Sequence, residues 1–199
     1  MTDEQAMWRV QRQDDGQAFA ELVKRWERPI QRLAMRLMGD RQRGEDLAQE
    51  TFARLFARRK QYECRGRFST FLWRMALNLC YDELRRRQRL PEIDLESVPE
   101  STLDFAEATL SPQPVAPDAH ALQTEESAQV RQALGELPEL YRTILVLRHY
   151  ENLKFREIAE VLEIPEGTVK SRMAEALTRL GRRLQPLCEP EKPPYEKYK

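Results

Sequence analysis

Apolar side chains recur at intervals of three and four residues through the first ninety positions, and this spacing predicts helices. One apolar stripe covers Phe19–Leu37 and ends before Gly39, a residue type common just after a helix. Pro29 predicts a local irregularity within this helix. We expect a second helix from about Glu45 and a third over residues 69–89.

The helical pattern stops after residue 90 and resumes with Val130, Leu134 and Leu137. The segment between combines prolines and acidic residues and lacks Lys and Arg, a composition typical of a linker that is extended or disordered when free. We therefore expect an all-α protein of two small helical domains. They occupy residues 1–90 and 128–186, with a flexible acidic linker at 91–127 and a tail at 187–199.

The sequence from residue 154 predicts two helices that meet at a tight turn, KFREIAEVLEIPEGTVKSRMAEALTRL. Ile158 and Leu162 give the first helix an apolar side, and Pro165 suits the first turn of the second, where its missing N–H does no harm. Such a pair is typical of a helix-turn-helix. The apolar face of the second helix comprises Val169, Met173, Ala176, Leu177, Leu180 and Leu184.

The opposite face of this second helix is polar and is a candidate DNA-reading surface. Short hydroxyls near a helix N-terminus can bind phosphates, and Lys or Arg can bind phosphates and guanine edges. A solvated helix would look similar, but the preceding helix and turn favour DNA binding. The residues of this face are Thr168, Ser171, Arg172, Glu175 and Arg179, with Lys170 at its margin.

A second candidate surface lies on the helix expected from Glu45. Asp46, Gln49, Glu50 and Ala53 are three and four residues apart and form a narrow polar face opposite Leu47. This face is either an ordinary solvated surface or a docking site. Asp46 and Glu50 as a catalytic acid and base are a weaker interpretation, because the sequence supplies no pocket, nucleophile or metal set near them.

The stretch GRFSTFLWRMALNLCYDELRRRQR interleaves aromatic residues with arginines, a pattern that suits stacking on unpaired bases while holding the phosphate backbone. Phe71 and Trp73 could equally belong to the core, where such residues are commonly buried. Asn78 is harder to assign to the core, because a buried amide needs a partner whereas an exposed one can bind a base edge.

Charge is unevenly distributed along this chain of 199 residues, although its formal net charge is zero. Residues 1–90 hold 20 basic residues (Lys and Arg) and 13 acidic residues (Asp and Glu). Residues 91–127 hold no basic and 9 acidic residues, and residues 128–199 hold 13 basic and 11 acidic residues. Basic blocks around an acidic connector point to a polyanion such as nucleic acid as a partner.

Several classes of protein are excluded by composition. No apolar run reaches the length of a membrane span, and the start of the chain lacks the pattern of a signal peptide, so we expect a cytoplasmic protein without membrane insertion. The three cysteines, Cys64, Cys80 and Cys188, are far apart, and neither histidine has a second ligand at metal-binding spacing. We expect no metal, no cofactor and no enzymatic activity.

With these motifs in view, the chain resembles the extracytoplasmic-function sigma factors of the bacterial sigma-70 family over residues 17–185. AFAELVKRWERPIQRLAMRLMGD and EDLAQETFARLF are similar to the first part of the N-terminal sigma domain, and GRFSTFLWRMALNLCYDELRRRQR to its promoter-melting part. LPELYRTILVLRHYENLKFREIAEVLEIPEGTVKSR is similar to the C-terminal sigma domain.

The resemblance implies three sets of contacts. It also implies several partners, namely the β′ clamp and β subunits of core RNA polymerase, promoter DNA and a candidate anti-sigma factor. The implied surface for the coiled coil of the β′ clamp comprises Asp46, Leu47, Gln49, Glu50 and Ala53. The implied minus-ten surface comprises Phe68, Ser69, Thr70, Arg74, Asn78, Tyr81, Arg85 and Arg86, with residues 68–70 as a loop that captures a flipped base. The implied minus-thirty-five surface comprises Thr168, Lys170, Ser171, Arg172, Glu175 and Arg179.

The resemblance also implies that the acidic linker runs toward the RNA exit path of the polymerase. The chain departs from the family pattern at Ala174 and Glu175, where many relatives carry a large or basic pair, and in its long proline-rich linker and its tail. The competing hypothesis is a helix-turn-helix regulator whose N-terminal block senses a signal or dimerises. Such a regulator needs neither the acidic docking face nor the aromatic and arginine-rich helix.

Overall fold

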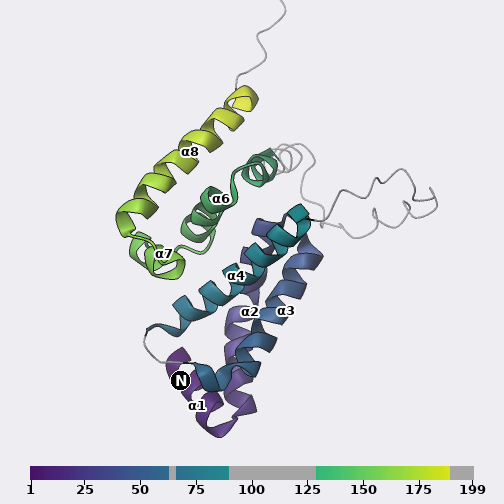
Figure 1. Cartoon of the computed structure of the whole chain (residues 1–199), viewed down its shortest axis with the longest axis vertical. Coiled ribbons are helices and arrows are strands. Elements are labelled where there is room, and N and C mark those ends of the chain that lie inside the picture. The colour runs from purple at the N-terminus through teal and green to yellow at the C-terminus, as the bar shows by residue number, and fades with distance from the viewer. Residues whose placement is uncertain (63–65, 90–128, 189–199) are drawn as a thin grey trace, which may run out of the picture.

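A computed structural model describes residues 1–62, 66–89 and 129–188, and within these ranges every regular element is helical, as expected from the sequence. The predicted linker and tail lie outside the described residues, apart from residues 187–188 at the end of the final helix. The N-terminal block contains α1 (Asp3–Gln13), α2 (Gly16–Met38), α3 (Arg41–Ala57), the short 3-10 turn η1 (Arg59–Gln61) and α4 (Phe68–Arg89). The C-terminal block contains a helical stretch at 129–135, α6 (Glu139–Leu145), the π-helical turn η4 (Val146–Tyr150), α7 (Phe155–Leu162) and α8 (Glu166–Cys188) (Figure 1).

Capping residues set the ends of α2 and α3. The Asp15 carboxylate accepts hydrogen bonds from two backbone amides at the start of α2, and Gly39, with φ of 69°, ends it. Asp40 then caps α3, which starts at Arg41, four residues before the predicted start at Glu45. A side-chain acceptor at Asp40 satisfies an otherwise unpaired amide of the first turn, so the helix begins there. The helix α2 continues through Pro29.

The sequence pattern did not predict α1. Thr2 and Gln5 form a capping box in which each side chain accepts from the other residue's backbone N–H, at 3.2 and 3.0 Å. Ala6, Met7 and Val10 are fully buried, so the helix contributes to the core of the N-terminal block. The capping box followed by this apolar spacing is the signal that could have located it.

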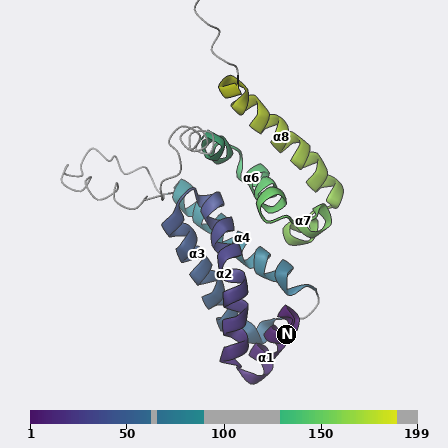
Figure 2. The ribbon, with the colours of Figure 1, turned by 180° about the vertical axis from the view of Figure 1, so that it is seen from behind.

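Gly44 of α3 marks a close approach between α3 and α2. A Cβ added there would lie 2.4 Å from Met35 Cγ and 2.7 Å from Met35 N of α2, both too short for real contacts. Only a residue without a side chain allows this approach. Both views show α2 and α3 running side by side along the block (Figures 1 and 2).

The C-terminal block contains the predicted helix-turn-helix. Glu163 ends α7 in the left-handed conformation, with φ of 56°, and Pro165 immediately precedes α8. Val169, Met173 and Ala176 of α8 are buried, as their spacing predicts, against α6 and α7. The prediction was wrong for Leu177, which is 46% exposed because it lies at the edge of the apolar face.

The two blocks pack against each other where α4 meets α7 and where α2 meets α6 and η4 (Figure 2). The Tyr81 hydroxyl donates to Thr143 Oγ1 at 3.0 Å, and the Arg142 guanidinium donates to the Leu37 carbonyl at 2.8 Å. Among the described residues, no helix is long and apolar enough to cross a membrane.

We expect Gly44→Ala to lower the free energy of unfolding by about 1 to 3 kcal/mol, because the backbone of Met35 cannot move away from a methyl group without separating α2 from α3. Chemical denaturation followed by circular dichroism measures this. Gly16→Ala is the matched control, because a Cβ there meets nothing within 4 Å and should leave stability nearly unchanged. Equal stabilities for the two variants would show that the approach is not tight.

Candidate nucleic-acid interface

The polar surface predicted on α3 is present and faces solvent. Asp46, Gln49, Glu50 and Ala53 are exposed, and we call these four residues the α3 face. Glu50 pairs with Arg54 at 2.5 Å, and Asp46 pairs with Arg43 at 3.5 Å. Both carboxylates remain about half exposed, so they can still meet a partner.

Leu47 was also predicted to contact the polymerase, but it is only 3% exposed and belongs to the core. It lies on the side of α3 that packs into the block, between the exposed Asp46 and the buried Ala48. We therefore exclude Leu47 from the docking surface.

On α4, five of the residues predicted to contact DNA share one side of the helix. With about 100° of rotation per residue, they fall within an arc of about 80°. Asn78 is exposed at the middle of this row, as predicted for a side chain that binds a base edge. We call the row the α4 stripe, and it comprises Thr70, Arg74, Asn78, Tyr81 and Arg85.

Phe68 does not lie in a loop, contrary to the prediction, and it cannot stack on a base in this structure. It is the first residue of α4 and is fully buried. Its ring packs edge-on against Trp26 and Tyr62, with centroids 6.4 and 6.2 Å apart, and its backbone N–H donates to Glu4 at 3.2 Å. Trp73 is likewise core, at 4% exposed, and its ring meets Trp26 at 5.7 Å.

Ser69 and Arg86 lie outside the α4 stripe. Ser69 is partly buried at the start of the helix, and Arg86 pairs at 3.0 Å with Glu83 on the other side of α4. Glu83 is 8% exposed and also binds Arg43 of α3 at 2.9 Å. The hydrogen bond from Arg43 holds the pKa of the Glu83 carboxyl below its ordinary value despite its burial, so the carboxylate ties α4 to α3 in its charged form.

The exposed face of α8 matches the predicted recognition helix. Lys170, Ser171, Glu175 and Arg179 are exposed, whereas Thr168 and Arg172 are half-buried. Lys170 pairs with Glu166 and Arg179 pairs with Glu175, each at 2.7 Å. The Glu175 charge, unexpected in a DNA-reading helix, is thus offset by a neighbouring arginine one turn further along. Arg179 also lies over the Tyr141 ring, 4.8 Å from its centroid.

Within the described ranges, no group of three or more His, Cys, Asp and Glu side chains lies close enough together to hold a metal ion. Cys80 is a free thiol in the core, and burial raises its pKa to about 12, so it remains protonated and unreactive at neutral pH.

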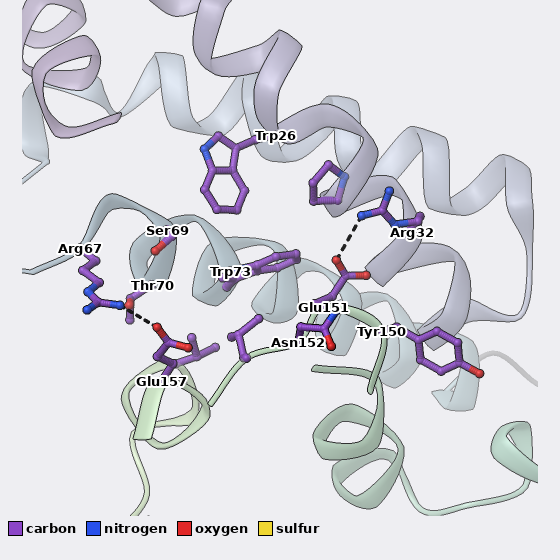
Figure 3. A pocket seen from close by; sticks show the side chains of 13 residues that line it. Trp26, Arg32, Arg67, Ser69, Thr70, Trp73, Tyr150, Glu151, Asn152 and Glu157 are labelled. Atoms are coloured by element: carbon purple, nitrogen blue, oxygen red, sulfur yellow. Dashed lines mark hydrogen bonds and ion pairs between the residues drawn. The ribbon is translucent and has the colours of Figure 1, made fainter. Parts of the chain in front are cut away.

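A cavity of about 370 Å³ lies between the two blocks (Figure 3). Trp26, Ser69 and Trp73 line it from the N-terminal block, and Glu151 and Leu153 from the C-terminal block. The Glu151 side chain is 3% exposed, and two arginines of α2 lie 3.5 Å from it, Arg32 and Arg36. Burial raises the pKa of Glu151, and the two arginines partly offset this increase.

The chain is similar to known proteins over nearly its whole length. Residues 22–90 match the family model described as sigma-70 region 2, and residues 127–180 match sigma-70, region 4. The chain is 32% identical to the ECF RNA polymerase sigma factor SigW of Bacillus subtilis, over 87% of this chain and 92% of SigW. It is 35% identical to the RNA polymerase sigma-H factor of Pseudomonas aeruginosa, over 93% of this chain and 95% of that factor.

Two solved structures share the fold. The first is CnrH in complex with the cytosolic domain of CnrY, with a TM-score of 0.67 and 21% identity over 92% of this chain and 97% of CnrH. The second is the sigma factor RpoE of Bartonella quintana in complex with the anti-sigma factor NepR, with a TM-score of 0.59 and 20% identity over 84% of this chain and 96% of RpoE.

Proposed function

The chain belongs to the extracytoplasmic-function sigma factors of the sigma-70 family, and we propose that its α3 face, α4 stripe and α8 carry out the three contacts this role requires. The main support for the proposal is that the segments containing these surfaces match the two sigma regions. The chain is an RNA polymerase sigma factor, which binds core polymerase, recognises promoter DNA and melts it. The competing hypothesis of a regulator with a sensory N-terminal block is not favoured, because that block matches sigma region 2.

We propose that the domain of residues 1–90 binds core polymerase through the α3 face. Its two half-exposed carboxylates, Asp46 and Glu50, suit a basic surface such as one side of a coiled coil of the β′ clamp. Gln49 lies between the two carboxylates and adds a hydrogen-bonding group. Ala53 lies beyond them and adds a small apolar contact.

The α4 stripe suits the unpaired non-template strand at the minus-ten element. Arg74 and Arg85 supply charge for phosphates, and Asn78 supplies an exposed amide that can bind a base edge. Since Phe68 is buried, we assign it to positioning the start of α4 rather than to stacking on a base. Tyr81 is the partly exposed aromatic residue of the stripe, and it stacks on the base instead of Phe68.

The C-terminal domain, residues 128–186, places the start of α8 in the major groove of the minus-thirty-five element. Thr168 and Ser171 supply hydroxyls near the helix N-terminus, and Lys170 and Arg172 supply positive charge. We propose further that the protein acts in the cytoplasm, where bacterial polymerase transcribes. One solved relative is bound to an anti-sigma factor, and we propose a partner of that class for this chain too.

Reversing the charge of the α3 face with Asp46→Lys and Glu50→Lys should weaken binding to core polymerase at least about tenfold, because like charges would then face each other. Co-purification with core enzyme and run-off transcription measure this. Glu21→Lys with Glu27→Lys, the same reversal on exposed residues of α2, is the matched control. Retention of wild-type binding by the Asp46 and Glu50 variant would refute the assignment.

Asn78→Ala should reduce open-complex formation about two- to tenfold, because it removes a hydrogen bond to a base while leaving an exposed helical position intact. Permanganate reactivity of the melted strand measures this. Gln17→Ala removes an exposed amide from α2 and should have no effect. An unchanged footprint for Asn78→Ala at a stable fold would contradict the role of Asn78.

Arg172→Ala should cost about 1 to 3 kcal/mol at one base position, whereas Lys170→Ala should weaken all promoters alike and lower the salt slope by about one unit. Binding of holoenzyme to single-base promoter variants at several salt concentrations separates the two effects. Glu175→Ala should relax one base position if Glu175 accepts from cytosine, and tighten binding uniformly if it only repels phosphate. No effect from any of the three would exclude α8 as the recognition helix.

A further inference from the structure

The helix α1 carries an exposed aromatic residue that the proposed function does not use. The match to sigma-70 region 2 begins at residue 22, so α1 lies before it. Trp8 is 52% exposed, whereas Met7 and Val10 on the other side of the helix are fully buried. A single exposed apolar side chain is common on protein surfaces, so its surroundings decide whether it has a partner.

Trp8 projects from the side of α1 that holds the start of α4. With about 100° of rotation per residue, Glu4 and Gln11 flank it within about 60° on that side. The Glu4 carboxylate accepts a hydrogen bond from the N–H of Phe68, the first residue of α4, at 3.2 Å. Gln11 donates to the carbonyl of Tyr62 at 2.7 Å. Both overall views place α1 beside the start of α4, where the α4 stripe begins (Figures 1 and 2).

The surface around α1 and η1 has a surplus of positive charge. The acidic residues of α1 and of the turn after it each have a partner in the structure, and they are Asp3, Glu4, Asp14 and Asp15. By contrast, Arg12, Arg58 and Lys60 are exposed and form no ion pair with any residue that the structure describes. Arg12 follows Trp8 by one helical turn, and Gln11 donates to the carbonyl of Lys60 at 3.3 Å. The exposed indole is therefore bordered by cations that no described acid neutralises.

An exposed indole bordered by unpaired cations suits an unpaired stretch of nucleic acid. Bases stack on aromatic rings, and Arg and Lys bind the phosphates that join those bases. A double helix offers no base face to such an indole, because its bases are stacked on one another. An apolar protein surface would cover the indole but would supply no negative charge for the cations. Single-stranded DNA supplies both the flat apolar face and the charge.

We propose that Trp8 is a second base-stacking residue, which holds one unpaired base of the melted strand beyond the N-terminal end of the α4 stripe while Arg12 binds an adjoining phosphate. This inference rests on the proposed function, because it takes the α4 stripe as the surface for the melted strand. Tyr81 lies 13 residues after Phe68, or about 20 Å along α4, so Tyr81 and Trp8 hold different bases. The buried ring of Phe68 cannot supply the stacking surface that Trp8 offers at this end.

The test compares holoenzymes that contain Trp8→Ala, Trp8→Leu or Trp8→Tyr. The measurement is their affinity for promoter DNA whose non-template strand is left unpaired at the minus-ten element. Trp8→Ala should weaken binding about five- to hundredfold, the range for removal of one stacked base. Trp8→Tyr should keep most of the affinity because its ring can stack, whereas Trp8→Leu is apolar without a ring and should lose as much as Trp8→Ala. Circular dichroism of each variant checks that the fold is unchanged.

Abasic sites placed one at a time in the unpaired strand identify the base that Trp8 holds. At one position, DNA without the base should bind the unaltered and the Trp8→Ala holoenzymes equally, because the contact is already absent. Arg12→Gln should lower the slope of log affinity against log salt concentration by about 0.7. Lys24→Gln, which removes the same charge from an exposed position of α2, is the matched control and should leave the slope unchanged.

Equal affinity of the unaltered and Trp8→Ala holoenzymes would overturn the proposal. Full affinity with Trp8→Leu, or no abasic position at which the effect of Trp8→Ala disappears, would also overturn it. Weaker binding of Trp8→Ala to core polymerase without DNA would identify a protein as the partner and refute stacking.

Asn78→Ala on the same DNA separates these failures from failure of the proposed function. A loss of affinity with Asn78→Ala but none with Trp8→Ala refutes only the role of Trp8. If the unaltered chain gives core polymerase no added affinity for the promoter, the proposed function is wrong and the assignment of Trp8 is wrong with it.

Discussion

The approach of α2 and α3 at Gly44 is the constraint on which the N-terminal block depends. Because the two backbones approach without a side chain between them, the direction of α3 is set by α2, and the α3 face turns outward as a consequence. Arg43, the residue before Gly44, then reaches Glu83 and ties α4 to the same pair of helices. One close contact thereby fixes the relative positions of the α3 face and the α4 stripe, which we propose bind polymerase and DNA.

The helix α4 serves two purposes on opposite sides. Its inner side carries Phe68, Leu72 and Cys80, which are fully buried, and its outer side carries the polar and basic α4 stripe. A helix whose core side is held by aromatic rings can present a fixed row of side chains to a flexible single strand. This explains why aromatic residues and arginines alternate in its sequence: the former mostly anchor the helix and the latter mostly face outward.

Much of this organisation follows from sequence spacing, because local periodicity determines which side of a helix is buried. The helix-turn-helix and the exposure of Asn78 and Glu50 were predictable for that reason. Phe68 was assigned to the wrong environment because an aromatic residue beside arginines is compatible with both stacking on a base and packing in a core. The residues whose rings contact Phe68 in the structure, Trp26 and Tyr62, belong to other elements of the chain, so the local sequence pattern does not reveal them. The pairing of Arg74 with Glu163 spans 89 positions, and spacing within one helix carries no information about it.

The tryptophan side chains make the contact between the blocks detectable by intrinsic fluorescence. Trp26 and Trp73 meet edge to face and both line the cavity shared with Glu151 and Leu153, whereas Trp8 lies exposed on α1, away from it. Separation of the blocks would expose the cavity to water and place the first two indoles in a more polar setting while leaving the third unchanged. The intrinsic fluorescence of the unlabelled protein would then shift toward longer wavelength, so that any separation of the blocks could be timed in a stopped-flow instrument without any dye.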